Sequence, residues 1–250
     1  MRLIHLAGLT TLAVLSSAML ASAADLRRAP APVYVPPPPP PAVYNWTGLY
    51  VGINGGGGWG GTDWLVTSAD DTFWPDSPGG DTGSLDSNGW LAGGQIGANW
   101  QNGPWVFGAE LSGDGGDIKG SATSTYGADD DVYTTRIQAL VIASAKIGFA
   151  AGNWMIYGKG GYAGASVKSS VSDTTAPLTG SGADTTWHSG YNLGVGAEVG
   201  LMANVSLGLQ YDFVHLSTVN ADLGDATAPN FVDISPKDTH IVTVRLNWRM

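Results

Sequence analysis

Six charged side chains are the residues of this sequence whose types and spacing most suggest chemistry. Each lies on the polar side of a stretch whose other side is apolar, and all but one lie at similar distances from a short turn or the chain end. Buried charges must pair, because an unpaired buried ion costs several kcal/mol. We therefore expect an interior ion-pair network with pairs such as Glu110–Lys146 and Glu198 with Lys159 or Arg245. The six residues are Glu110, Arg136, Lys146, Lys159, Glu198 and Arg245.

This network has two interpretations. It either forms a permanently closed structural layer, or it opens to pass ions and small solutes through a narrow, porin-like channel. Glycines on the same polar side favour the channel, because they would leave space for water. These glycines are Gly93, Gly97, Gly190, Gly194 and Gly196.

A second candidate for chemistry is the tripeptide His215-Leu216-Ser217. In a strand, alternation places His215 and Ser217 on one face, as a serine nucleophile and its base require. Some eight-stranded barrels deacylate lipid A with such a pair, so a lipid A hydrolase is a remote alternative. The sequence shows no acidic residue that would complete a catalytic triad with this pair. Neither His188 nor His240 has other metal-ligating residues at a suitable spacing. We therefore expect no enzyme, no catalytic residue, no cofactor and no metal site.

The charged residues are carried by eight stretches in which apolar and polar residues alternate. In the segment 88–101, for example, Trp90, Ile96 and Trp100 share one side, and glycines and amides occupy the other. A period of two predicts β-strands. The eight stretches are 48–60, 88–101, 105–112, 135–150, 153–164, 186–201, 205–213 and 242–250.

Short and long breaks separate these stretches in turn. The short breaks carry turn residues, at Asn102-Gly103, Gly152-Asn153 and Ala203-Asn204. The long breaks, read as loops, cover roughly 62–87, 114–131, 168–186 and 218–237. An even number of strands with short turns at one end and long loops at the other is typical of bacterial outer-membrane barrels. The pattern predicts an all-β fold, an eight-stranded antiparallel up-and-down transmembrane β-barrel.

Tryptophan positions distinguish this barrel from a water-soluble β-sandwich. Tryptophans on the apolar side fall into two groups, one near the short turns and one near the long breaks. Indole rings prefer membrane interfaces, so two such groups predict an aromatic girdle on each side of a lipid-facing band. A β-sandwich would explain the alternation but not the two groups. The predicted girdle residues are Trp59, Trp90, Trp100, Trp105, Trp154, Trp187 and Trp248.

The N-terminal segments and the net charge of the chain limit where the protein can be located and which partners it can bind. Residues 1–23 read as a cleaved signal peptide, residues 24–44 as a proline-rich periplasmic segment, and residues 45–250 as the barrel. The six consecutive prolines are a stiff spacer or a ligand for a periplasmic partner. A net charge of −10 argues against a nucleic-acid partner. The chain has no cysteine, and so no disulfide or thiolate site.

Acidic residues concentrate in the long breaks, including Asp63, Asp81, Asp86 and the run 129–131. Clustered carboxylates are hard oxygen ligands, so divalent cations could link the loops to anionic lipopolysaccharide. The alternative is that these carboxylates only solvate exposed loops. Outer-membrane lipid and lipopolysaccharide are the expected partners in either case.

Several segments resemble the outer-membrane immunogenic protein family of alpha-proteobacteria, porin-family surface proteins with an OmpA-like eight-stranded barrel. The resemblance rests on the order and spacing of glycine-aromatic motifs across nearly the whole mature chain. These motifs are "NWTGLYVGINGGGGWG" (45–60), "GGQIGANWQNGPWVFGAE" (93–110), "KIGFAAGNWMIYGKGGYAGA" (146–165), "GYNLGVGAEVGL" (190–201) and the closing "VTVRLNWRM".

The resemblance implies an abundant surface antigen in the outer membrane, exported by its signal peptide and inserted by the assembly machinery. Its function would be non-enzymatic, in envelope integrity and in surface interaction through acidic extracellular loops. Two positions depart from the family pattern. The chain ends in Met250 where Phe is common, which puts assembly efficiency in question. Gln210 stands where an acidic residue is common, which would thin the interior charge network.

Overall fold

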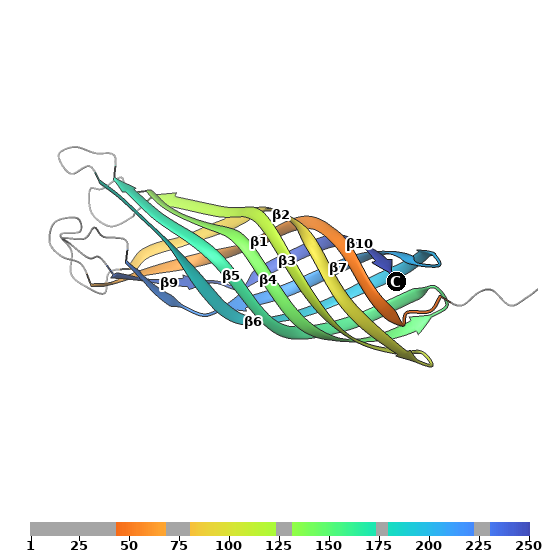
Figure 1. Ribbon diagram of the computed structural model, residues 1–250. Helices are drawn as coiled ribbons and strands as arrows, with labels where there is room; N and C mark the ends of the chain where they lie inside the picture. Colours follow the sequence, from red (N-terminus) through yellow and green to blue (C-terminus); the bar gives the residue numbers. More distant parts are fainter. Residues whose placement is uncertain (1–43, 69–80, 124–131, 174–179, 223–230) are drawn as a thin grey trace, which may run out of the picture. The chain divides into compact units, whose positions relative to one another are not determined.

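A closed ring of eight antiparallel β-strand paths forms the fold in the computed structural model (Figure 1). The structure describes residues 44–68, 81–123, 132–173, 180–222 and 231–250. The predicted all-β barrel is therefore confirmed. The predicted signal peptide and nearly all of the proline-rich segment lie outside the described residues. Among the residues described, no helix is long and apolar enough to cross a membrane.

Six paths are single strands and two are interrupted. β7 continues into β8 across Ser217-Thr218, and β9 continues into β10 across Lys237-Asp238. The β1–β10 pairing closes the ring. The strands are β1 (Gly48–Ser68), β2 (Asp81–Asn102), β3 (Trp105–Thr123), β4 (Val132–Ala151), β5 (Trp154–Asp173), β6 (Gly180–Met202), β7 (Val205–Leu216), β8 (Val219–Asp222), β9 (Phe231–Pro236) and β10 (Thr239–Arg249).

The strand register fixes how steeply the strands are inclined. A line of paired residues that starts at Trp100 on β2 passes once around the ring and returns to β2 at Trp90. The path is therefore displaced by 10 residues along β2. With 3.3 Å per residue and 4.8 Å between strands, eight strands and this displacement give a tilt of roughly 40°.

The same displacement separates the two groups of tryptophans. Ten residues along a strand at this tilt rise roughly 25 Å, which matches the height of the apolar band in outer-membrane barrels. All seven predicted girdle tryptophans point outward, with 48% to 61% of each residue exposed. Leucine, isoleucine and valine side chains between the two rows are exposed as well, including Leu49, Ile53, Ile156 and Leu193. The apolar stripe therefore covers the outside of the barrel.

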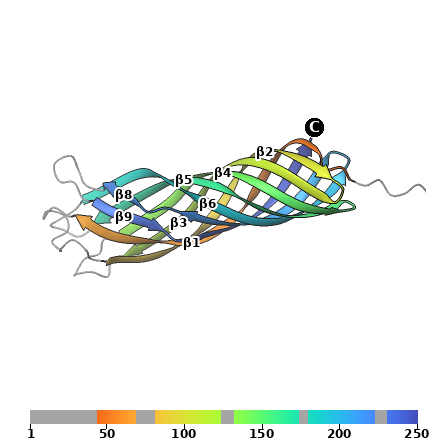
Figure 2. The same ribbon diagram turned by 90° about the horizontal axis from the view of Figure 1, so that it is seen from below.

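The predicted long loops are largely strand, which corrects the sequence-based boundaries. β1 and β2 stay paired up to Leu65 and Asp81, and β5 and β6 stay paired up to Asp173 and Gly180. Figure 2 shows β8 and β9 at this end of the barrel, where β9 continues the sheet by pairing with β1. The error arose because small and polar residues there hide the alternation. Asp63, Asp81 and Asp86 are strand residues, whereas the run 129–131 lies outside the described residues.

A β-bulge in β4 changes which residues face the interior. Pairing with β5 shifts between Ile137 and Ala139, so one residue of β4 is left over. Below the bulge the even-numbered residues Leu140 and Ile142 are buried, and above it the odd-numbered Tyr133 and Thr135 are buried. A one-residue slip moves every following side chain to the opposite face of a sheet.

Candidate functional site

Glu110 on β3 is the centre of a charged layer inside the barrel. Its carboxylate lies 2.5 Å from the Arg245 guanidinium, 3.4 Å from Lys159 Nζ and 4.0 Å from Lys146 Nζ. The strands β10, β5 and β4 bring these three bases to the acid. Each of these side chains is at most 2% exposed, so the charges interact without solvent screening.

Two further acids complete the layer. Lys146 Nζ lies 3.8 Å from Glu198, and Lys159 Nζ lies 3.2 Å from Asp212. The layer thus contains three acids and three bases and has no net formal charge. The structure brings together five of the six residues predicted for the network. The expected Glu110–Lys146 pair is present, whereas Lys159 and Arg245 pair with Glu110 instead of Glu198.

Arg136 is not part of this layer, which corrects the sequence-based prediction. It forms an ion pair with Asp117 at 2.9 Å, and its side chain is 46% exposed. The physical reason is the bulge in β4, which lies between Arg136 and Lys146 and turns the arginine outward. Counting alternate residues through the bulge gave the wrong face.

Neutral polar side chains tie the charges together. Tyr50 donates a hydrogen bond to Glu110 Oε2 at 2.6 Å, and Tyr157 donates to Gln210 Oε1 at 2.8 Å. Gln210 also accepts a hydrogen bond from Arg245 and donates to Asp212. The amide at position 210 therefore joins a base to an acid. Alternation in the sequence is consistent with an inward position of Gln210 and both tyrosines, but an uncharged residue gives no signal of pairing.

Tyrosine rings occupy the space that two inward glycines were expected to leave for water. A Cβ added at Gly97 would lie 2.4 Å from the Tyr50 ring, and one added at Gly196 would lie 2.5 Å from the Tyr157 ring. Lys146 Nζ sits 4.9 Å and 4.8 Å from the centres of these two rings. These glycines allow close packing of the interior, so their interpretation as room for water was wrong.

An aromatic cluster lies below the charged layer, at the short-turn end of the barrel. Tyr44 and Trp46 are buried inside the ring together with Val106 and Met155. The Arg249 guanidinium stacks on both rings, at 4.7 Å and 5.1 Å, and donates a hydrogen bond to the Asn45 carbonyl. The residues just before β1 therefore fill the mouth of the barrel at the short-turn end.

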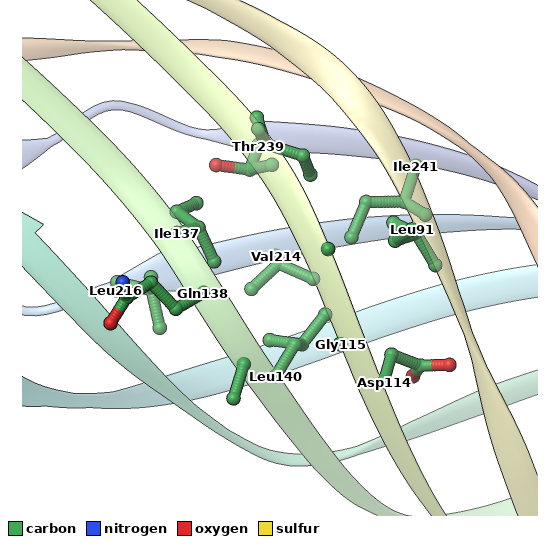
Figure 3. Close-up of a pocket in the computed structure, with 13 residues that line it drawn as sticks. Leu91, Asp114, Gly115, Ile137, Gln138, Leu140, Val214, Leu216, Thr239 and Ile241 are labelled. Atoms are coloured by element: carbon green, nitrogen blue, oxygen red, sulfur yellow. The ribbon is translucent and has the colours of Figure 1, made fainter.

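An apolar layer lies above the charged layer. Leu91, Leu140, Val214, Leu216 and Ile241 converge there from four strands (Figure 3). A small cavity among them has a volume of about 10 Å³, and another between this layer and Arg245 has about 20 Å³. Each volume is about that of a single water probe. The lumen between the two layers is therefore filled.

A second apolar core lies inside the extended strands. Trp64 packs against Tyr133 with ring centres 5.1 Å apart, and its indole donates a hydrogen bond to Thr135. Leu85, Val171, Ala221, Val232 and Ile234 complete this cluster. The end of the barrel opposite the short turns thus has a packed interior of its own.

His215 has the acidic partner that the sequence did not reveal. Its Nδ1 atom lies 2.8 Å from Asp238 Oδ1, and about half of each side chain is exposed. Asp238 follows β9 and is distant from His215 in sequence, so no local spacing could indicate it. Ser217 forms hydrogen bonds through its backbone. Its N–H donates to the Ser189 carbonyl, and its carbonyl accepts from His188. Within the described residues, no hydrogen bond joins the Ser217 hydroxyl to His215. No group of three or more possible metal ligands occurs there either.

Comparison with known proteins agrees with this geometry. The chain matches the family of the outer membrane protein beta-barrel domain over residues 10–249. The 31 kDa outer-membrane immunogenic protein of Brucella melitensis is 31% identical over 218 residues, which cover 82% of this chain and 84% of that protein. The chain belongs to the outer-membrane immunogenic β-barrel protein family. The protein of the same name from Brucella suis matches equally well.

Solved structures support the fold of this family member. The outer membrane protease OmpT from Escherichia coli superposes with a TM-score of 0.50 over 84% of this chain and 99% of that chain. Sequence identity is 9%, so the likeness concerns the fold alone. The predicted family and the predicted outer-membrane location are both confirmed. The chain is an outer-membrane β-barrel surface protein.

Proposed function

We propose that this protein is a non-enzymatic surface protein. Its closed barrel supports strand segments that extend outside the membrane, and these segments contribute to envelope integrity and surface interaction. The observation that carries the proposal is the length of the strands. β2 begins at Asp81, nine residues before Trp90 in the outer tryptophan row. Nine residues at the barrel's tilt rise roughly 23 Å beyond the membrane interface.

The filled lumen favours this role over a channel. An ion that entered the barrel would meet an aromatic cluster, a layer of paired charges and two apolar layers. Transfer of an ion into an apolar layer carries a large desolvation cost. A channel would therefore require at least the layer of Leu140 and Ile241 to rearrange.

The strand segments that extend past the outer tryptophan row, here called the extracellular wall, supply polar groups for contacts at the cell surface. Lys237, in the β9–β10 break, contacts Asp63 on β1 at 3.0 Å and Ser84 on β2 at 2.7 Å. Asp86 is exposed on the same wall. Loops and edges on a rigid scaffold are where binding residues concentrate. Lipopolysaccharide, with or without bridging divalent cations, is the partner we propose, and insertion would depend on the outer-membrane assembly machinery.

A complementation experiment tests the role of the extracellular wall. A strain that lacks the protein would receive the wild type or a variant in which residues 64–83 are replaced by Asn-Gly, a favoured two-residue hairpin turn. We expect the wild type to restore resistance to detergent and the shortened variant to fail, although the latter still shows the heat-dependent mobility shift of a folded barrel. Full restoration by the shortened variant would contradict the proposal.

A Ser217→Ala variant serves as the matched control for the non-enzymatic part of the proposal. It removes the hydroxyl that a lipid A hydrolase would need and leaves the extracellular wall intact. We expect it to restore resistance as well as the wild type does. Failure of a folded Ser217→Ala variant would favour the hydrolase instead.

A further inference from the structure

One edge of β6 carries no partner strand at the end of the barrel opposite the short turns. The ladder between β6 and β5 runs up to Gly180, whereas the ladder between β6 and β7 stops at Gly190. β8 follows β7 along the chain but pairs with β9 (Figure 2). Among the described strands, none pairs with this side of β6 over residues 183–187, here called the open edge. The open edge begins at Trp187 of the outer tryptophan row and extends away from the membrane.

The ladder with β7 ends where the chain breaks at Ser217. The Ser217 N–H still donates to the Ser189 carbonyl on β6 at 2.9 Å. The Ser217 carbonyl, however, accepts a hydrogen bond from the buried side chain of His188, also at 2.9 Å. A side chain thus takes the position of the next backbone donor, and beyond it the chain continues as β8 beside β9.

Backbone groups of the open edge point to the side where no strand pairs. The Ser189 carbonyl points to this side, and backbone direction alternates along a strand. The N–H and C=O groups of Ala183, Thr185 and Trp187 therefore point there as well. The Thr185 N–H donates to the carboxylate of its neighbour Asp184 at 2.7 Å. This carboxylate occupies the position that the carbonyl of a partner strand would otherwise take.

The spacing of these backbone groups specifies the kind of partner. Every second residue of a strand points the same way, so such residues recur at about 6.8 Å. An extended polypeptide presents N–H and C=O groups at the same interval, whereas sugars and lipid chains do not. Addition of a strand to an exposed sheet edge is a recurring mode of peptide recognition, in which main-chain hydrogen bonds supply the affinity.

A second copy of this chain in the same membrane does not fit the open edge. Two barrels in one membrane stand the same way up, so the strands on their facing sides would cross at roughly 80°, twice the tilt. Adjacent strands of a sheet differ in direction by only about 20–25°. The partner must therefore be free to align with β6.

Charges beside the open edge favour a basic partner. β6 carries Asp184 at the open edge and β8 ends in Asp222, and neither strand contains a lysine or an arginine. Lys168 lies across from Thr185 on β5, on the opposite side of β6 from the open edge. A carbonyl of an incoming strand would accept the Thr185 N–H and release the Asp184 carboxylate. A lysine or arginine of that strand would then pair with the released carboxylate.

We propose that the open edge of β6 binds an extended, basic segment of another protein outside the cell as an added β-strand. The proposal rests on the surface role proposed above and adds a protein partner to it. Binding to the purified protein tests it, whereas complementation tests the envelope role, so either proposal can fail without the other.

The test measures binding of a fluorescent seven-residue peptide of alternating valine and lysine to the refolded protein in micelles, by fluorescence anisotropy. Thr185→Pro removes the N–H and places a ring on the open edge. Proline is tolerated at strand edges where the N–H is not part of a ladder. Thr185→Val is the matched control, because it alters the side chain and keeps the N–H. Gel mobility with and without heating would show that each variant is folded.

Two further peptides probe the wild type alone, so the test does not depend on folding of Thr185→Pro. One has every backbone N–H methylated, which preserves its charge but prevents a ladder. The other replaces each lysine by glutamate, which tests the preference for a basic strand.

We expect wild type and Thr185→Val to bind the lysine peptide equally. Thr185→Pro should bind it at least about tenfold more weakly, because one backbone hydrogen bond is lost and the ring blocks the edge. The wild type should not bind the methylated peptide and should bind the glutamate peptide more weakly. Equal binding of the lysine peptide by Thr185→Pro and wild type would overturn the proposal. So would equal binding of the lysine peptide and either of the other two peptides by the wild type, or the absence of saturable binding.

Discussion

Two adjacent layers of the barrel interior close the same lumen by different means. The charged layer consists of six side chains, with three bases around Glu110, whereas the apolar layer uses branched residues such as Leu140 and Ile241. Pairing determines the free energy of the first layer, since each charge lost leaves another one buried and unpaired. Filled volume determines that of the second. The two layers should therefore respond differently to mutation and to salt.

Glu110→Ala should have the largest effect, because it removes the acid shared by three bases. We expect the free energy of unfolding to fall by about 3–5 kcal/mol, as is typical when one partner of a buried ion pair is deleted. Urea titration of the refolded protein in micelles, followed by tryptophan fluorescence, would measure it. Ser112→Ala, the next buried inward residue of the strand, is the control. A loss no larger than that of Ser112→Ala would show that the charged layer contributes little.

Leu140→Ala tests the apolar layer by creating a cavity without leaving a charge. The expected loss is about 2–4 kcal/mol, the usual range for a buried leucine. The same urea titration applies. Because no charge is involved, the loss should be the same at low and high salt. A strong salt dependence would contradict the distinction between the layers.

Gly97→Ala sharpens the description of the charged layer. The added methyl group would approach the Tyr50 ring and displace it from Glu110 and Lys146. Overpacking of this kind costs about 1–3 kcal/mol. Gly113→Ala places the same methyl group in open space and should leave the stability within about 0.5 kcal/mol of the wild type. Equal stability of the two variants would mean that the ring does not lie over Gly97.

Arg136→Ala should have the smallest effect, although the arginine also forms an ion pair. Its pairing with Asp117 is solvent-exposed, and such pairs contribute less than about 1 kcal/mol. Added salt should remove most of that contribution. Should Arg136→Ala destabilise the barrel as strongly as Glu110→Ala, Arg136 would belong to the interior after all.

Alternation alone was enough to predict the ring, its short turns and the inward position of Glu110. The outward apolar band also followed, because every second residue from Leu49 to Ile53 is apolar. The true strand ends did not follow, because polar strand residues such as Ser84 and Asp86 resemble a loop. Alternation failed at Arg136, since a bulge of one residue leaves no mark in the sequence. The pairing of His215 with Asp238 depends on the β7–β10 register, which only the three-dimensional structure defines.

The central claim is that the paired charges and the apolar layers close the barrel. Single-channel recording of the refolded mature protein in a planar lipid bilayer tests it most directly. A folded wild-type barrel should give no current steps in concentrated potassium chloride. Discrete, reproducible steps that change in Lys146→Ala or Glu198→Ala would show a conducting lumen and contradict the account.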